Sequence, residues 1–184
     1  MHKTLLIGIA AAAALSLAGA AAAQEKTAYV GANAGMTKWN VDWNRTNEDT
    51  SGTGYRVYAG YNFHRWFGAE VFYWDLGKTT ASPAELKGSG YGVAGVYNLR
   101  FGRDQAARFM ARAGLASNKA TGNTASRNFA GTKSSVNAAI GVGMGYDVAK
   151  NVMLRADLDL TSIEAADGQA GGVQMLSAGV TFRF

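Results

Sequence analysis

The chain has 184 residues, enough for one domain, and its 18 lysines and arginines exceed its 13 acids by a net charge of +5, which gives no reason to expect a nucleic-acid partner. It has no cysteine and only two histidines, which excludes a disulfide scaffold, a Cys/His zinc site and a cysteine nucleophile. Because 48% of the residues are hydrophobic and 24 are glycine, a disordered tail protein is also excluded.

Residues 1–23 are predicted to be a cleaved secretory signal peptide. A basic start at Lys3 precedes an apolar stretch over 5–18, and Ala21-Ala22-Ala23 gives the A-x-A spacing of a cleavage site before Gln24. The alternative, an uncleaved membrane anchor, is weaker because most of these residues are alanine. The expected mature domain is 24–184, which is 184 − 23 = 161 residues, and it contains no further apolar run of helix-spanning length.

The mature chain alternates between apolar and other residues with the period of a β-strand. One face of each segment carries no charge, as with Leu154 and Leu158, whereas the other carries glycine and charges, as with Arg155 and Asp157. Eight segments show this alternation: 28–36, 54–63, 67–74, 90–99, 108–115, 136–146, 152–160 and 176–184.

The predicted connections alternate in length. Short links near 62–66, 100–107 and 149–151 alternate with long polar segments, which are expected as loops: 38–53, 75–90, 117–134 and 161–174. Short turns at one end and long loops at the other are typical of transmembrane barrels.

The cost of placing charge in lipid determines which face of the strands points outward. An arginine facing lipid at mid-membrane costs about 2–4 kcal/mol, and unpaired strand edges are not tolerated in hydrocarbon. The apolar faces must therefore point outward and the sheet must close. The expected fold is all-β, an eight-stranded antiparallel up-and-down transmembrane β-barrel. A soluble lipocalin-like barrel would instead place its apolar face inside.

Glycine is concentrated on the predicted inner face, where a barrel of this size has little room for side chains. We expect these glycines to make space for the arginines and aromatic rings opposite them: Gly31, Gly35, Gly60, Gly68, Gly92, Gly141, Gly143 and Gly145.

Three stretches resemble the transmembrane domain of OmpA-like outer-membrane proteins. They are 60–63 with 68–71 and Asp75-Leu76-Gly77, then 153–157, and most specifically 175–184. The resemblance implies the bacterial outer membrane, both mature termini in the periplasm and four loops outside. It also implies that Phe182 and Phe184 are the signal for the outer-membrane assembly machinery. Since the chain stops at Phe184, the peptidoglycan-binding domain of many relatives is expected to be absent.

The resemblance also implies an ion-pair cluster of two acids and two bases in the lumen. Glu70 and Arg155 match one acid and one base, while Ala94 and Gly145 stand at the other two positions. A buried charge needs a partner, and Arg56, Arg112, Asp157 and Asp159 share the predicted inner face. A structural role for the cluster is favoured over a gate. The candidate lumen cluster is Glu70, Arg155, Asp157, Arg112 and Arg56.

Other motifs favour simple interpretations. The G-x-G-x-x-G match at 90–95 continues as strand alternation, so it does not predict a dinucleotide site. His64 lies alone in a predicted periplasmic turn, without the partners that a barrel hydrolase needs. Aromatic residues at the strand ends are expected to form interfacial girdles. They are Trp39, Trp43, Trp66, Trp74, Tyr61, Tyr73, Phe63 and Phe182.

Loop 117–134 carries Lys119, Arg127 and Lys133 and no acid, which motivates the hypothesis that it contacts lipopolysaccharide phosphates. The expected function is therefore a non-catalytic outer-membrane barrel, without a cofactor, that supports membrane integrity and binds through its loops. The alternative is a narrow pore for ions or small solutes, which lumen residues such as Tyr58 and Phe72 argue against. A lipid-modifying enzyme is the least expected outcome.

Overall fold

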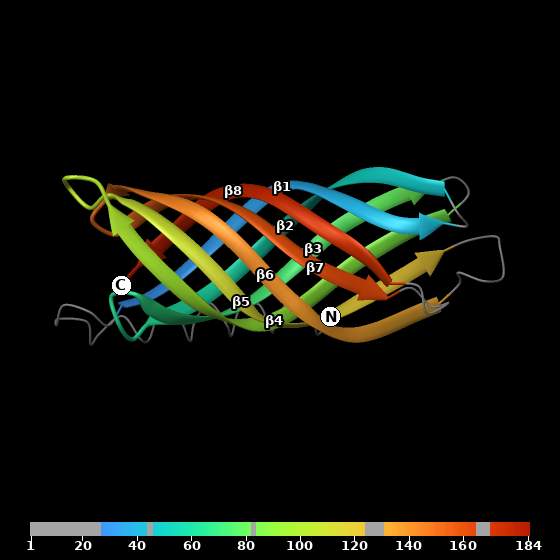
Figure 1. The fold of residues 1–184 in the computed structure, drawn as a ribbon, viewed down its shortest axis with the longest axis horizontal. Helices are drawn as coiled ribbons and strands as arrows, with labels where there is room; N and C mark the ends of the chain where they lie inside the picture. Colours follow the sequence, from blue (N-terminus) through green and yellow to red (C-terminus); the bar gives the residue numbers. More distant parts are fainter. Residues whose placement is uncertain (1–26, 44–45, 82–83, 124–130, 165–169) are drawn as a thin grey trace, which may run out of the picture.

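The computed structural model describes residues 27–184 except 44–45, 82–83, 124–130 and 165–169. These residues form a closed antiparallel barrel in which each strand pairs with the next and β8 pairs with β1 (Figure 1). The predicted fold class is confirmed. The strands are β1 Thr27–Trp43, β2 Thr46–Asn62, β3 Phe67–Ala81, β4 Ala84–Phe101, β5 Ala107–Asn123, β6 Gly131–Ala149, β7 Val152–Glu164 and β8 Ala170–Arg183.

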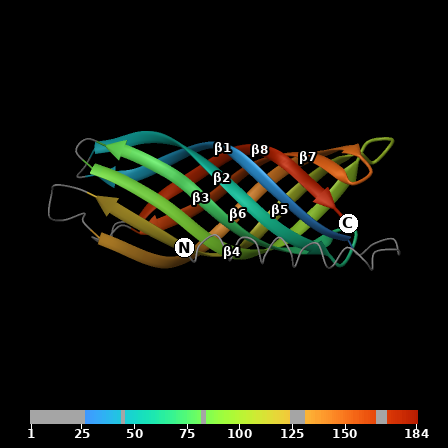
Figure 2. The same ribbon diagram turned by 180° about the vertical axis from the view of Figure 1, so that it is seen from behind.

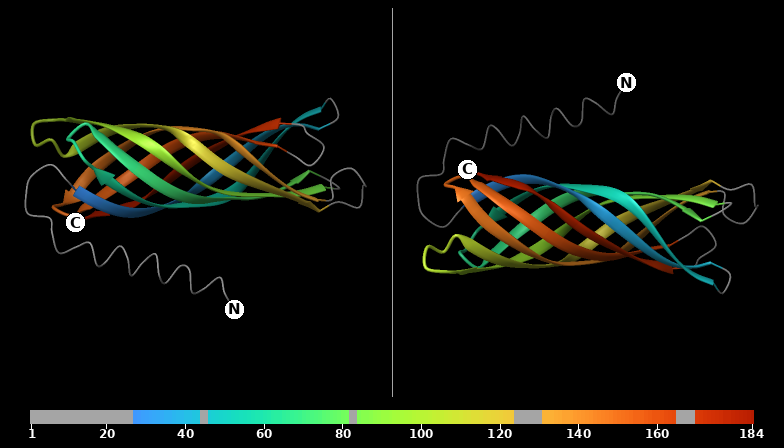
Figure 3. Two further views of the ribbon diagram at one scale, coloured as in Figure 1. Left: turned by 90° about the horizontal axis from the view of Figure 1, so that it is seen from below. Right: turned by 90° about the horizontal axis from the view of Figure 1, so that it is seen from above.

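The pairing of β8 with β1 closes the sheet into a barrel. The β1–β8 ladder runs from Tyr29↔Arg183 to Asn40↔Gly172, and Figures 2 and 3 show the tilted strands continuing around every side. Because neighbouring strands pair all the way round the belt, this part of the barrel can exist in hydrocarbon. No helix in the described part of the chain is long and apolar enough to cross a membrane.

The predicted faces are also confirmed. Apolar side chains on the outer wall are exposed, as with Val71 (56%), Leu115 (58%) and Ile140 (54%). In contrast, Arg56 and Glu70 are each 1% exposed and lie inside. The alternation of the sequence therefore separates a surface suited to lipid from a polar interior.

The two ends of the barrel differ. The chain reverses in short turns at the end that holds the C-terminus (Figure 1). At this end the Phe184 amide donates to the Ala28 carbonyl at 2.9 Å, which ties the C-terminus to β1. The opposite end, here called the far end, holds the other four connections.

The prediction of long irregular loops at the far end was wrong. Most of the residues concerned continue the strands, as in the pairs Lys38↔Ser51, Lys78↔Lys87 and Ser89↔Lys119. We call this part of the wall the far extension and the part nearer the short turns the belt. The far extension comprises 37–43, 46–53, 75–81, 84–89, 117–123, 131–135, 161–164 and 170–175.

The far extension reverses the distribution of polarity seen in the belt. Its inward residues include Trp39 and Val173, which are 0% and 1% exposed, whereas Lys38 and Gln174, one position away, are exposed on the outer wall. The alternation thus persists with its sides exchanged. A search for strands with an apolar outer face misses such a segment, which explains the mistaken loop prediction.

Candidate functional site

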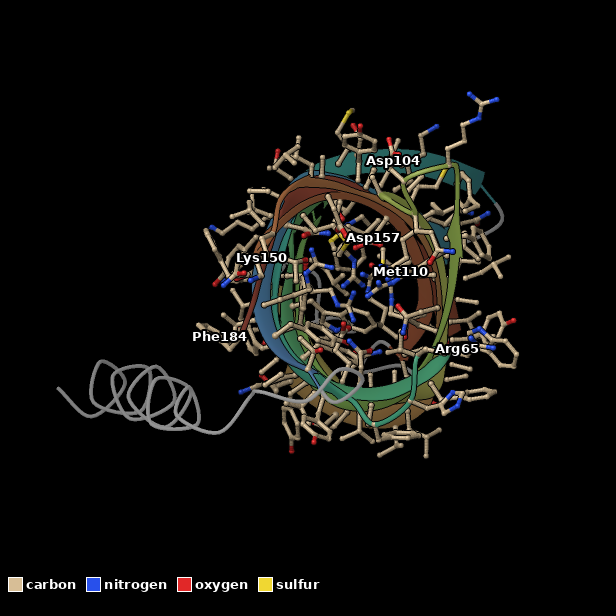
Figure 4. The ribbon with its side chains drawn as sticks, turned by 90° about the vertical axis from the view of Figure 1, so that its left-hand side faces the viewer. Arg65, Asp104, Met110, Lys150, Asp157 and Phe184 are labelled. Atoms are coloured by element: carbon tan, nitrogen blue, oxygen red, sulfur yellow. The ribbon has the colours of Figure 1, made fainter. Side chains whose placement is uncertain are left out.

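Six charged side chains form a closed ring inside the belt. Arg56 comes from β2, Glu70 from β3 and Arg112 from β5, whereas Arg155, Asp157 and Asp159 all come from β7. None of the six is more than 5% exposed. Seen from the short-turn end, Asp157 points into the barrel (Figure 4).

Each member of the ring contacts two members of opposite charge. Glu70 lies between Arg56 and Arg155, with 3.2 Å from its Oε2 to Arg155 Nη1. Asp157 lies between Arg155 Nε at 2.7 Å and Arg112 Nη1 at 2.8 Å. Asp159 joins Arg112 Nη2 at 2.8 Å to Arg56 Nη1 at 3.6 Å and so closes the ring. Three positive charges are thus balanced by three negative ones.

Neutral side chains support this ring. The Tyr29 hydroxyl donates to Glu70 at 3.2 Å and the Asn33 amide donates to Asp157 at 2.5 Å. The Arg155 guanidinium lies 4.4 Å from the centre of the Tyr58 ring, and that of Arg56 lies 4.7 Å from the centre of the Phe72 ring. Hydrogen bonds and aromatic faces thus compensate part of the hydration that these buried charges have lost, while Arg56 Nε and Arg112 Nε have no hydrogen-bond partner within the described part of the chain.

Two glycines of β6 make room for the ring. Gly141 pairs with Arg112 on one side and with Asp159 on the other, and a Cβ there would lie 2.8 Å from Arg112 Nη2. A Cβ on Gly143 would collide with the Asp157 carboxylate. Because these positions have no side chain, Arg112 of β5 can form ion pairs with the carboxylates of β7 across β6. This is the packing role predicted for the inner glycines.

Beyond the ring, at the far end, an apolar plug fills the lumen. Each plug residue is at most 2% exposed, and all belong to one hydrophobic cluster. The placement of Trp39 and Trp74 in an interfacial girdle was therefore wrong. The apolar plug consists of Trp39, Trp74, Leu76, Ile163, Val173 and Met175.

The structure brings all five residues of the candidate lumen cluster into the ring: Glu70, Arg155, Asp157, Arg112 and Arg56. It adds Asp159, which had been placed on the inner face but not in the cluster. The available signal was its position two residues after Asp157, which puts both carboxylates on one side of β7. Arginines contact all three carboxylates, and the described residues include no group of three or more His, Cys, Asp or Glu side chains placed to hold a metal ion.

The three predicted lipopolysaccharide contacts do not gather on one face in the described part of the chain. Lys119 is exposed on the outer wall of β5, whereas Lys133 lies on the inward side of β6 with its Nζ 3.1 Å from Glu164. Arg127 lies outside the described residues. On the outer wall, Lys119 instead lies diagonally across from Lys87 on β4, which in turn pairs with Lys78 on β3.

The remaining candidates lie near the short-turn end. Phe182 is 49% exposed on the outer wall of β8, and Phe184 directly follows that strand. His64 lies in the β2–β3 turn, where its Nδ1 accepts the Trp66 amide at 3.3 Å.

Comparison with known proteins identifies the architecture. The profile of the outer membrane protein beta-barrel domain matches residues 7–184. Neisserial surface protein A is 23% identical with a TM-score of 0.71, over 85% of this chain and 97% of that one. The N-terminal barrel domain of Pseudomonas aeruginosa OprF is 22% identical with a TM-score of 0.55, over 85% and 97%.

A third structure is Ail, the attachment invasion locus protein of Yersinia pestis, in complex with the heparin analogue sucrose octasulfate. It is 17% identical with a TM-score of 0.54, over 88% of this chain and 100% of that one. No functionally curated protein sequence matches the chain. At these identities the solved structures establish the fold and leave the ligand open.

Proposed function

Because the chain belongs to the outer membrane protein β-barrel family, we propose that it is a non-catalytic, non-conducting barrel that strengthens the bacterial outer membrane and binds partners at its surface. The observation that carries this proposal is the filled lumen. The ring closes the belt with matched charges, and the apolar plug closes the far extension. A solute would have to displace both barriers.

The void beside the ring is small. A cavity lined by residues that include Arg155, Met110 and Met153 has a volume of about 10 Å³, roughly room for a single water. Ions would therefore have to enter an apolar plug and then separate paired buried charges, both of which are costly. This supports a closed barrel over the alternative of a narrow pore.

Single-channel recording in planar bilayers tests the proposal. The mature protein, shown to be folded by its shift in gel mobility on heating, should give no stable current steps, while a porin prepared in the same way gives them. Trp39→Ala should also be silent, because the ring remains. Reproducible steps from the folded wild type would contradict the closed barrel and support the pore.

We also propose that the short turns and both mature termini face the periplasm and that the far extension projects from the cell. The longer stretch of chain between belt segments at the far end, as over 37–53, than at the short-turn end, as over 63–66, supports this orientation, because outer-membrane barrels keep their shorter connections in the periplasm. An epitope inserted at 82–83 should bind antibody on intact cells, whereas one inserted at Gly102 should bind only after permeabilisation. The reverse labelling would contradict this orientation.

The hypothesis of lipopolysaccharide contact by Lys119, Arg127 and Lys133 is best tested at the outer wall. Lys119 and Lys87 stand there on neighbouring strands, where phosphates beside the barrel could reach them. Lys119→Gln with Lys87→Gln should raise polymyxin and detergent sensitivity. Arg103→Gln, which removes an exposed base at the short-turn end, is the control. Equal sensitivity of both strains to the wild type would remove support for this contact.

We also propose that residues 1–23 direct export and that Phe182 and Phe184 direct assembly in the outer membrane. Sequencing of the mature N-terminus should begin at Gln24 if residues 1–23 are a signal peptide. Phe184→Ala should reduce the amount of heat-shiftable protein in the outer membrane without reducing synthesis, if the last strand is read by the assembly machinery. Unchanged amounts after substitution of both Phe182 and Phe184 would contradict that role.

A further inference from the structure

The mouth of the barrel at the short-turn end holds a basic cavity. Its volume is about 400 Å³. Its lining includes three arginines and a histidine but no acid. The lining residues are Thr27, Asn62, His64, Arg65, Trp66, Arg100, Gln105 and Arg108.

Arg108 is the most informative residue of this cavity. It is 4% exposed, and its Nε and Nη2 have no hydrogen-bond partner within the described part of the chain. Its nearest carboxylate, Asp147, lies 3.7 Å from Nη2 and is closer to Arg183 Nη1, at 3.0 Å. One carboxylate thus serves two arginines, which leaves a buried positive charge poorly compensated.

The other charged residues around the mouth of the barrel, here called the rim, add to this excess of positive charge. In the described residues of the short-turn end, the acids are Asp104, Asp147 and the terminal carboxylate of Phe184. The bases at the same end are Arg65, Arg100, Arg103, Arg108, Lys150 and Arg183. The ring deeper in the belt pairs every arginine with two acids, so the excess at the mouth is a local property of this site.

We propose that this cavity binds a phosphate-bearing anion. Guanidinium groups from the β2–β3 turn, β4 and β5 line it, and Arg100 of β4 pairs directly with Arg108 of β5, so several donors are available to the oxygens of a tetrahedral anion. His64 also lines the cavity, and its Nδ1 accepts the Trp66 amide at 3.3 Å. This inference does not depend on whether the lumen conducts.

The position of the cavity admits two sources of phosphate. Phe63, Trp66 and Phe67 are 53%, 41% and 48% exposed beside it, and the Arg65 guanidinium lies 4.4 Å from the Trp66 ring centre. Exposed aromatic rings of this kind mark headgroup depth. Either a lipid headgroup or a soluble phosphate compound can therefore reach the mouth.

Isothermal titration of the mature protein in an uncharged maltoside detergent tests the site. The probes are inorganic pyrophosphate and the short-chain lipid dihexanoyl phosphatidylglycerol. Arg108→Gln should weaken binding at least about tenfold, because it removes charge-assisted hydrogen bonds. Arg65→Gln, at an exposed position that tolerates change, should weaken it several-fold. The matched control is Arg103→Gln, which removes a base of the same rim outside the cavity lining and should change affinity by less than about twofold.

The pattern of binding decides the proposal. Tighter binding of the lipid identifies a headgroup site, and tighter binding of pyrophosphate identifies a soluble ligand. Both patterns support an anion site if Arg108→Gln or Arg65→Gln weakens binding selectively. Absence of binding by the folded wild type to both probes would overturn the proposal. So would equal weakening by Arg103→Gln, because it would indicate unspecific attraction to the rim.

Discussion

The belt and the far extension are parts of the same strands with opposite distributions of polarity. In the belt, hydrophobic residues such as Val71 face outward and charges such as Arg155 face inward. In the far extension, Lys38 faces outward and Trp39 faces inward. The second arrangement is that of a water-soluble barrel. The comparison shows that one ladder of hydrogen bonds can cross from lipid to water if only the side chains exchange sides.

The largest effect is expected from removing a charge inside the belt. Asp157→Asn leaves Arg112 and Arg155 without a full counter-charge in a buried site, which should lower the free energy of unfolding by about 3–5 kcal/mol. Urea titration followed by the heat-dependent gel shift measures this change. Asp104→Asn, at an exposed turn position, is the control and should remain within about 0.5 kcal/mol of the wild type. A small loss for Asp157→Asn would mean that the ring contributes little.

An arginine on the outer wall tests where lipid ends. Val71→Arg in the belt should cost about 2–4 kcal/mol in phospholipid vesicles, because the charge faces hydrocarbon. Gln174→Arg, on the outer wall of the far extension, should change stability by less than about 0.5 kcal/mol. Equal costs at the two positions would contradict the division of the wall into belt and far extension.

A smaller effect is expected at the glycines that seat the ring. Gly143→Ala places a methyl group against the Asp157 carboxylate and should cost about 1–3 kcal/mol by overpacking. Gly172→Ala, where an added Cβ would meet nothing within 4 Å, is the matched control in the far extension. It should be neutral, or stabilising by less than about 1 kcal/mol. Equal destabilisation by both changes would indicate a general cost of replacing strand glycines.

The smallest effect is expected at an exposed ion pair of the far extension. Lys133 and Glu164 lie 3.1 Å apart with side chains 37% and 38% exposed, so Lys133→Gln should cost less than about 1 kcal/mol. The same urea titration in high salt should reduce the difference from the wild type further, because salt screens exposed charges. A loss as large as that of Asp157→Asn would remove the energetic distinction between the two regions.

The belt could be predicted from the sequence because its environment imposes one rule on every strand. Lipid excludes charge from the outer wall, so the period of two fixed both the strands and the inward position of Glu70 and Arg155. The far extension follows no single rule of that kind. There Thr37 and Trp39 face inward and alternate with Lys38 and Asn40, which face outward. In the sequence alone this pattern resembles a polar loop with a girdle tryptophan.

The contacts within the candidate site were harder to predict than its members. Sequence places Arg112 and Asp159 on the inner face, but only the register brings them to opposite sides of Gly141. In the same way, Lys119 and Lys133 are close in sequence and lie on opposite faces of the wall. The basic cavity likewise combines residues of the β2–β3 and β4–β5 turns, which the pairing of β3 with β4 brings side by side.

The ring has a consequence for biogenesis. Arg112 meets its carboxylates only when β5, β6 and β7 lie side by side, and the contact between Glu70 and Arg155 joins β3 to β7 across the lumen. A lone hairpin entering the bilayer would carry unneutralised charges, whereas the cylinder hides all of them at once. We therefore expect insertion to be concerted, with membrane entry and cylinder formation occurring in one cooperative step.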